Sequence, residues 1–345
     1  SCGNEHVSVP ARCYRPYGAI FVYLTSFKRM AMLCAILVLT ITSISAFIRL
    51  SNAGLGCVDW PQCYGQNFRQ AQQGVASKPS ESATLIGARM VHRIAAVAAL
   101  MLIIAMLVTC LGTRPVPWQA CAMTIALLLL ALFLAVLGRW SSSARVPAVA
   151  IGNLLGGFAM LALCWRLIVM PDPGVESTGA VKRSGWLRTG AWLGVAVLLC
   201  QIALGGLVSA SYSGLSCTGL TGCAEMSGTI EPPGAIPAQA KLSIPQALNP
   251  WREPIFSPAS PANSAGVIPH MAHRYGAFAS LLVLLPLGLL ALRNGRHRSG
   301  LFLLALLVAQ AGLGIVLIAF ALPLWGALAH NLIAAMMLAM VFSLI

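Results

Sequence analysis

Eight long apolar segments constrain the fold of this chain more than any other feature of its sequence. They lie near residues 30–48, 83–110, 118–138, 148–168, 189–210, 266–292, 299–320 and 326–345. An α-helix needs about 20 consecutive apolar residues to cross the hydrocarbon core of a bilayer. Only 9% of the residues are charged, against about 25% in soluble domains. The sequence therefore predicts an all-α polytopic membrane protein with eight transmembrane helices.

The net charge of +14 raises the question of nucleic-acid binding. The basic residues, however, lie in the short connectors between apolar segments, where they set the orientation of the chain in the membrane. They are Lys28, Arg29, Arg114, Lys182, Arg183, Arg188, Arg293, Arg296 and Arg298. We therefore expect no nucleic-acid partner, a cytoplasmic N-terminus, and the two long loops near 49–82 and 211–265 on the opposite side. Because residues 1–27 lack a transit-like pattern, we expect a bacterial inner (plasma) membrane.

Two cysteine pairs with the same spacing indicate an internal repeat. Cys57 and Cys63 follow the first predicted helix, and Cys217 and Cys223 follow the fifth, 160 positions later. The second and sixth helices also match, with His92-Arg93 and His273-Arg274. The third and seventh carry Leu137-Gly138 and Leu313-Gly314. The fourth and eighth carry Asn153-Leu154-Leu155 and His330-Asn331-Leu332. Parallel repeats of this kind occur in membrane proteins.

The repeat predicts two pseudo-symmetric four-helix bundles. We expect an N-terminal half at residues 28–170 and a C-terminal half at residues 189–345, joined by a cytoplasmic linker at 171–188 and preceded by a tail at 1–27. Because four helices per unit preserve the direction of the chain, equivalent residues of the two halves lie on the same side of the membrane.

Two histidines at a similar depth indicate a heme site in the C-terminal half. His273 and His330 each lie within the first two turns of a predicted transmembrane helix, counted from the long-loop side. Two imidazoles at one level of a bundle hold a heme iron from both sides. The alternative is that each is a polar residue of the helix core. His270, one turn before His273, is a weaker ligand candidate, whereas His297, in a basic connector, is expected to be solvated.

The N-terminal half has one histidine at the matching level. His92 corresponds to His273, but Asn153 stands at the position of His330. Because asparagine is a poor iron ligand, this half predicts a five-coordinate heme with an open face, as a reactive site needs. A decayed site, with Asn153 bonding a neighbouring helix, is the alternative.

The arginines that follow the two histidines suit heme propionates. Arg93 and Arg274 each follow a candidate ligand, and guanidinium groups pair bidentately with carboxylates. Snorkelling of both side chains to lipid headgroups is the alternative.

The loop cysteines face an oxidising compartment in this topology. Intraloop disulfides Cys57–Cys63 and Cys217–Cys223 would hold the loops over the heme sites, and disulfide exchange in a redox relay is the alternative. Five other cysteines lie within apolar segments and are expected to pack as small hydrophobic residues. They are Cys34, Cys110, Cys121, Cys164 and Cys200.

The first loop resembles the signature of the heme A synthase family. The residues that carry the resemblance are Arg49-Leu50-Ser51-Asn52-Ala53-Gly54-Leu55-Gly56-Cys57, Asp59-Trp60-Pro61 and Cys63-Tyr64-Gly65. The two His-Arg helices and His330-Asn331 also match, so that the resemblance spans about residues 30 to 345.

The resemblance implies an oxidoreductase that converts heme O to heme A, for the assembly of heme-copper oxidases. Members oxidise the methyl group at ring position C8 to a formyl group, by successive hydroxylations to a gem-diol that loses water. The family binds heme b in the C-terminal half, at positions that match His273 and His330, and substrate heme in the N-terminal half, at His92. The implied partners are a heme O synthase, membrane lipid and a quinol or other electron donor. A homo-oligomer is left open.

Two departures from the family pattern concern the substrate site. Asn153 replaces the histidine that is common on the fourth helix, and Arg89 stands where many members have a glutamate thought to be important for catalysis. We assign His92, Asn153 and Arg89 to the catalytic site, where Arg89 cannot act as a base at ordinary pH. The alternatives to the enzyme are a non-catalytic heme-binding assembly factor or carrier, and a b-type membrane cytochrome.

Overall fold

Long helices dominate the structure, which is a computed structural model. It describes residues 17–72, 82–141, 146–170, 185–217, 219, 223, 243–254 and 263–345. Eight are long and apolar enough to span a membrane. They are α1 (Tyr17–Asn52), α3 (Ala83–Gly112), α4 (Trp118–Ser141), α5 (Pro147–Ile168), α6 (Gly185–Ala210), α8 (Val267–Arg293), α9 (His297–Ala319) and α10 (Leu324–Ser343). Three short ones are α2 (Gln66–Gln72), α7 (Ile244–Ala247) and the 3-10 helix η1 (Ser264–Gly266). The described residues contain no strand, so the predicted all-α class and the eight predicted transmembrane helices are confirmed.

Local sequence signals fix the ends of several helices. Ser82 caps α3 by accepting a hydrogen bond from the backbone N–H of Leu85. Pro147 occupies the first position of α5, where no backbone donor is needed. Gly295, with φ of 74°, follows α8 in the left-handed conformation that favours glycine. The largest difference from prediction is α1, which begins at Tyr17, well before residue 30.

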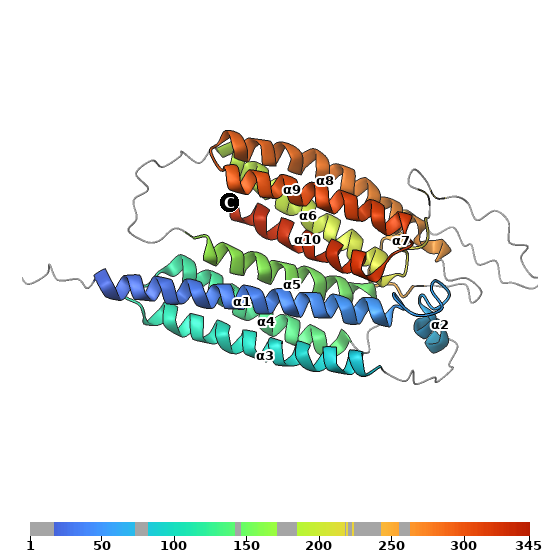
Figure 1. The fold of residues 1–345 in the computed structure, drawn as a ribbon, viewed down its shortest axis with the longest axis horizontal. Helices are drawn as coiled ribbons and strands as arrows, with labels where there is room; N and C mark the ends of the chain where they lie inside the picture. Colours follow the sequence, from blue (N-terminus) through green and yellow to red (C-terminus); the bar gives the residue numbers. More distant parts are fainter. Residues whose placement is uncertain are drawn as a thin grey trace, which may run out of the picture.

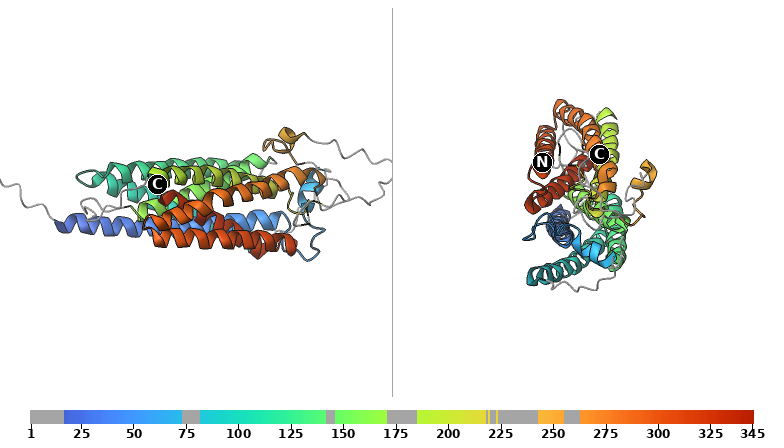
Figure 2. Two further views of the ribbon diagram at one scale, coloured as in Figure 1. Left: turned by 90° about the horizontal axis from the view of Figure 1, so that it is seen from above. Right: turned by 90° about the vertical axis from the view of Figure 1, so that its right-hand side faces the viewer.

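The eight long helices form two groups of four with matching neighbours. In the first group α1 contacts α3 and α5, and α4 completes the ring between α3 and α5. In the second group α6 contacts α8 and α10, and α9 lies between them. Figures 1 and 2 show the two groups side by side, with all long helices roughly parallel to one axis. Helices α3 and α5, like α8 and α10, are therefore diagonal partners. A rotational symmetry that relates the groups stays a prediction.

The fourth helix of each group forms the boundary between the two groups. There α5 packs against α10 and α6, and α1 packs against α10. Gly206 of α6 allows a close approach, because a Cβ atom there would lie 3.1 Å from Ile151 and 3.3 Å from Leu154 of α5. One hydrophobic core runs through both groups. Large apolar side chains such as Ile94, Val108, Leu282 and Val308 are exposed on the outside, as expected of a lipid-facing surface.

The loops with the cysteine pairs lie together at one end of the bundle, which we call the cysteine-loop end (Figure 1). There Leu50, Leu55 and Tyr64 of the first group pack against Tyr212 and Leu322 of the second. The indole of Trp60 donates a hydrogen bond of 3.0 Å to the turn between α9 and α10. The first loop is therefore built into the end of the C-terminal half.

Burial at this interface makes two phenols harder to ionise. Burial raises the pKa of Tyr64 well above its usual value, and it raises the pKa of Tyr212 to about 12. The rings of Tyr64 and Tyr212 meet edge to face with centroids 5.7 Å apart, a favourable arrangement for an aromatic pair.

Candidate heme sites

The structure brings His273 and His330 together inside the second group of helices. Each is the seventh residue of its helix, His273 in α8 and His330 in α10. Both helices begin at the cysteine-loop end, so the equal count places the imidazoles at one level. The ring centroids are 6.4 Å apart and the ring planes are inclined by 72°. Since α8 and α10 are diagonal partners, the rings face each other across the bundle.

The spacing of the two rings suits an iron between them. With each imidazole nitrogen at about 2 Å from a metal, the ring centroids must lie roughly 6 to 6.5 Å apart, which the observed 6.4 Å satisfies. The Nδ1 atoms of both histidines are buried without a hydrogen-bond partner. Within the described residues, no group of three or more His, Cys, Asp or Glu side chains gathers to hold a metal ion. The donor set is therefore a pair of imidazoles, which fits heme.

The two remaining helices of the second group each contribute a glutamine at the histidines. Gln201 of α6 donates a hydrogen bond of 2.9 Å from Nε2 to the backbone carbonyl of His273. Gln310 of α9 places its Nε2 atom 3.1 Å from Nε2 of His330. Gln310 therefore positions the ring of His330 through its Nε2 atom, a nitrogen that can also bind a metal.

A glycine follows each glutamine by one helical turn and lies against the ring of a histidine. A Cβ atom at Gly205 would come within 2.9 Å of Cε1 of His273, and one at Gly314 within 3.8 Å of Cε1 of His330. Sequence reasoning noted Gly314 as a matched position of the repeat but gave none of these four residues a role at the site. The signal was Gln-x-x-x-Gly in two apolar helices, since a polar side chain at membrane depth is costly and therefore informative.

Arg274 holds a loop in this structure. Its guanidinium donates hydrogen bonds of 2.6 Å to the carbonyl of Gly219 and 2.9 Å to that of Cys217. Both acceptors belong to the loop that the Cys217–Cys223 disulfide closes. Arg274 therefore ties this loop to the turn of α8 that carries His273, and its predicted contact with a propionate stays a prediction.

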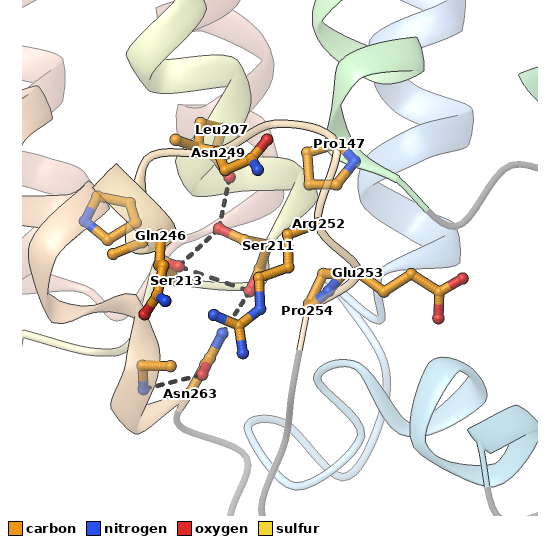
Figure 3. A pocket seen from close by; sticks show the side chains of 13 residues that line it. Pro147, Leu207, Ser211, Ser213, Gln246, Asn249, Arg252, Glu253, Pro254 and Asn263 are labelled. Carbon is orange, nitrogen blue, oxygen red and sulfur yellow. Dashed lines mark hydrogen bonds between the residues drawn. The ribbon is translucent and has the colours of Figure 1, made fainter. Parts of the chain in front are cut away.

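His270 belongs to a buried polar network at the cysteine-loop end. Its Nδ1 atom lies 2.9 Å from the carbonyl oxygen of Ser213. Asn263 donates to the carbonyl of Ser211, and the hydroxyls of Ser211 and Ser213 are 2.8 Å apart (Figure 3). The neighbouring cavity, bounded by Pro147, has a volume of about 40 Å³, enough for a few water molecules and far too small for heme. We therefore assign His270 a structural role.

In the first group, His92 and Asn153 point into the bundle from diagonal helices. His92 lies on the buried stripe of α3 that continues through Ala95 and Ala99. On α5, Gly156 faces α4 and Gly157 faces α1. At 100° per residue Asn153 lies between these two directions, toward the interior. Both side chains are partly buried.

The two other arginines assigned to this half lie differently. Arg93 is exposed and lies off the buried stripe of α3, so the structure does not bring it together with His92. Arg89 is partly buried, one turn before His92. A further arginine, Arg49 of α1, has a buried Nε atom without a hydrogen-bond partner. Sequence reasoning gave Arg49 no role of its own.

Both loop cysteine pairs are bonded in the structure, Cys57 to Cys63 and Cys217 to Cys223. Four of the five cysteines in apolar segments are buried as expected, and they lie in pairs with Sγ–Sγ distances of 2.6 Å for Cys110 and Cys121 and 3.6 Å for Cys34 and Cys164. The prediction was wrong for Cys200, which is exposed. Its position on α6 points away from the buried stripe of that helix.

Comparisons with known proteins agree with this arrangement. The profile of a family described as cytochrome oxidase assembly protein matches residues 28–342. A protein named heme A synthase from Shewanella oneidensis is 33% identical over 332 residues, which cover 91% of this chain and 93% of that protein. A heme A synthase from Methylobacterium sp. (strain 4-46) is 32% identical over 56% of this chain and 50% of its own length. One from Methylobacterium nodulans is 37% identical over 42% of this chain and 36% of its own length.

Proposed function

Because the chain belongs to the cytochrome oxidase assembly protein family, we propose that it is a heme A synthase, a membrane oxidoreductase that converts heme O to heme A. The pair of His273 and His330, with ring centroids 6.4 Å apart, is the observation that carries this proposal. It adds a heme-compatible site to a similarity that extends over 91% of the chain. The product would serve the assembly of heme-copper oxidases.

The C-terminal half would hold a resident heme b. His273 and His330 would be its two axial ligands, and a bis-histidine heme supplies one-electron redox chemistry. Gln310 positions the ring of His330, and Gly205 makes room for the ring of His273. Arg274, next to His273 in the sequence, donates to the carbonyl of Cys217 in the adjoining disulfide-closed loop, and this loop would lie over the site.

The N-terminal half would hold heme O as substrate. His92 would bind the substrate iron from one side, while Asn153 faces the interior without offering a strong ligand. Arg89, one turn from His92, is a permanent cation and can only attract anions or donate hydrogen bonds. Oxidation of the C8 methyl group to a formyl group would take place in this half.

The setting of the reaction follows from the membrane topology. The eight spans and the basic connectors support a bacterial inner membrane protein with a cytoplasmic N-terminus. A hydrophobic substrate then arrives through the lipid, from a heme O synthase. The electron donor would be a quinol or another membrane-borne reductant, and a homo-oligomer remains a further proposal.

The direct test is mass spectrometry of the hemes extracted from the purified protein after co-expression with a heme O synthase. We expect heme B together with heme A or a hydroxylated heme O. The matched control is His92→Ala, which should keep heme B and lose heme A and its intermediates. Formation of heme A at the wild-type level in His92→Ala would refute the assignment of the N-terminal half.

Asn153 and Arg89 favour a second candidate, a heme-binding assembly factor without oxidation chemistry. Neither side chain supplies the imidazole or the carboxylate that the family commonly has at these positions. This candidate predicts heme B alone in the same extraction, with heme O demonstrably present in the cells. The two functions are therefore separated by one measurement.

A further inference from the structure

Arg49 places part of a charged guanidinium inside the protein without a hydrogen-bond partner among the residues that the structure describes. Its Nε atom is buried without a hydrogen-bond partner. Thr42 faces Gly157 of α5, and Arg49 follows it by seven residues, only about 20° away around the helix. The buried residues Ala46 and Ala53 lie on the same side of α1. Arg49 therefore points into the protein rather than sideways toward lipid headgroups.

The register of α1 against α5 places Arg49 near the candidate substrate site. Thr42 contacts Gly157, and Cys34 lies 3.6 Å from Cys164, so the two helices run antiparallel. Continuing this register brings Arg49 level with residue 150, about one turn nearer the cysteine-loop end than Asn153. Arg49 is three residues from the end of α1, whereas His92 is nine residues into α3. At 1.5 Å per residue these positions are roughly 5 and 14 Å from the helix ends.

The protein offers Arg49 no carboxylate partner inside the membrane. All eight acidic residues lie outside the eight spans that the structure describes. They are Glu5, Asp59, Glu81, Asp172, Glu176, Glu225, Glu231 and Glu253. Among the described residues, the buried Nε atom of this guanidinium therefore has no partner, and such an atom is costly, which a folded membrane protein tolerates where function requires the charge. The position 160 residues later, in the C-terminal half, is Ser209, so the charge belongs to one half only.

We propose that Arg49 forms a carboxylate-binding site in the N-terminal half and that its ligand is a propionate of the substrate heme. The inference rests on the proposed function, since it takes heme O as the molecule that enters this half. Arg49 lies toward the cysteine-loop end from His92, so a heme held by His92 would direct its propionates toward that end. The guanidinium would donate charge-assisted hydrogen bonds to the carboxylate and fix the rotation of the ring about the iron–imidazole bond.

The test compares heme O with its dimethyl ester, in which both propionates are uncharged. Binding is followed by absorbance titration of purified protein whose C-terminal site is already filled with heme b. Wild type should bind the ester at least about tenfold more weakly than heme O. Arg49→Met should bind heme O as weakly as wild type binds the ester, with no further loss on esterification. Arg49→Lys should keep part of the preference.

The matched control is Arg139→Met, which removes an exposed arginine from the end of α4, in the same half and at the same end of the bundle. It should keep the full preference for heme O over the ester. Thermal unfolding adds a readout that a structural role would not give. Arg49→Met should unfold at a higher temperature than wild type in the absence of heme O, because it removes an uncompensated buried charge. A purely structural arginine would give a lower unfolding temperature.

Two results would overturn the proposal. If Arg49→Met binds heme O as wild type does, or loses as much affinity on esterification, then Arg49 contacts no propionate. If Arg49→Met loses co-purifying anionic phospholipid while its preference for heme O persists, then the anion is a lipid phosphate. Because the titration requires no turnover, an ester effect that depends on Arg49 would remain even if the wild-type protein formed no heme A.

Discussion

Gly205→Ala offers the sharpest test of the heme b site, because the structure sets both the size and the direction of the perturbation. The added Cβ atom would lie 2.9 Å from Cε1 of His273, whereas ordinary contacts begin at 3.4 Å. The imidazole or the helix must therefore shift by about 0.5 Å, near the tolerance of a preorganised metal site. Overpacking of this kind costs about 1–3 kcal/mol. If the cost falls on the bound geometry, heme b affinity drops roughly 5- to 150-fold.

Gly314→Ala is the matched control, since its Cβ atom would lie 3.8 Å from Cε1 of His330, an ordinary contact distance. Both glycines are helical and follow a glutamine by four residues, so the two variants differ mainly in this distance. In a helix, Gly→Ala is intrinsically favourable by about 1 kcal/mol. Gly314→Ala should therefore keep its heme b and unfold at an equal or higher temperature.

The assay is the ratio of heme b to protein in the purified variants, together with the absorption spectrum of the reduced protein. Gly205→Ala should show partial heme occupancy that added heme restores, while its helix content stays unchanged. Full occupancy with a wild-type spectrum in Gly205→Ala would refute the argument that the ring of His273 is held against α6. Equal losses in both glycine variants would contradict it as well, since only one of them crowds a histidine.

Three further predictions concern the ligands and the loop interface. His273→Ala and His330→Ala should each remove the bis-histidine heme b spectrum, whereas His92→Ala should leave it intact; an unchanged spectrum in both of the first two variants defeats the ligand assignment. Trp60→Phe removes the 3.0 Å hydrogen bond to the α9–α10 turn and should lower the free energy of unfolding by about 0.5–1.5 kcal/mol. An unfolding curve identical to that of wild type would contradict this prediction. Burial raises the pKa of Tyr212 to about 12. The stability that its neutral phenol contributes is therefore complete below the unfolded-state pKa of about 10 and is lost as pH rises from 10 toward 12. Thermal unfolding between pH 8 and 11 should show this loss of stability, and Tyr212→Phe should make the loss smaller.

Hydropathy was enough to predict the helices, because a membrane leaves few alternatives to a helix of about 20 apolar residues. The predicted span near 83–110 corresponds to α3 at Ala83–Gly112 and the one near 148–168 to α5 at Pro147–Ile168. The start of α1 could not be predicted in the same way. Residues 17–24 (YGAIFVYL) are apolar but too few to span a membrane, so length alone did not predict that the helix begins at Tyr17.

The candidate site was predictable only in part. His273 and His330 were found because an ionisable residue is rare within an apolar segment and because the repeat aligned them with His92 and Asn153. The role of Arg49 was not predictable, since an arginine near the end of a transmembrane helix usually snorkels to the surface. Its inward direction depends on how α1 packs against α5, which a single sequence does not contain.

The two halves share a helix order but differ in the number of ligands and supporting side chains at their candidate sites. The C-terminal site has two facing imidazoles, and Gln310 holds one of them. When Gly138 is aligned with Gly314, Leu134 takes the place of Gln310 in the first half, and it packs against Gly156 instead. The first half also lacks a second imidazole.

This difference is the one expected between a resident cofactor and a substrate that must leave. A group held by two protein ligands dissociates slowly, which suits a permanent redox centre. A substrate site that bound its product as tightly would be limited by product release. In the proposed site, one imidazole at His92, a weak partner at Asn153 and the guanidinium of Arg49 would provide orientation without permanent retention. On this argument Asn153→His, which completes a second axial pair, should slow the release of heme A, and product retained on the purified variant would be the measured sign.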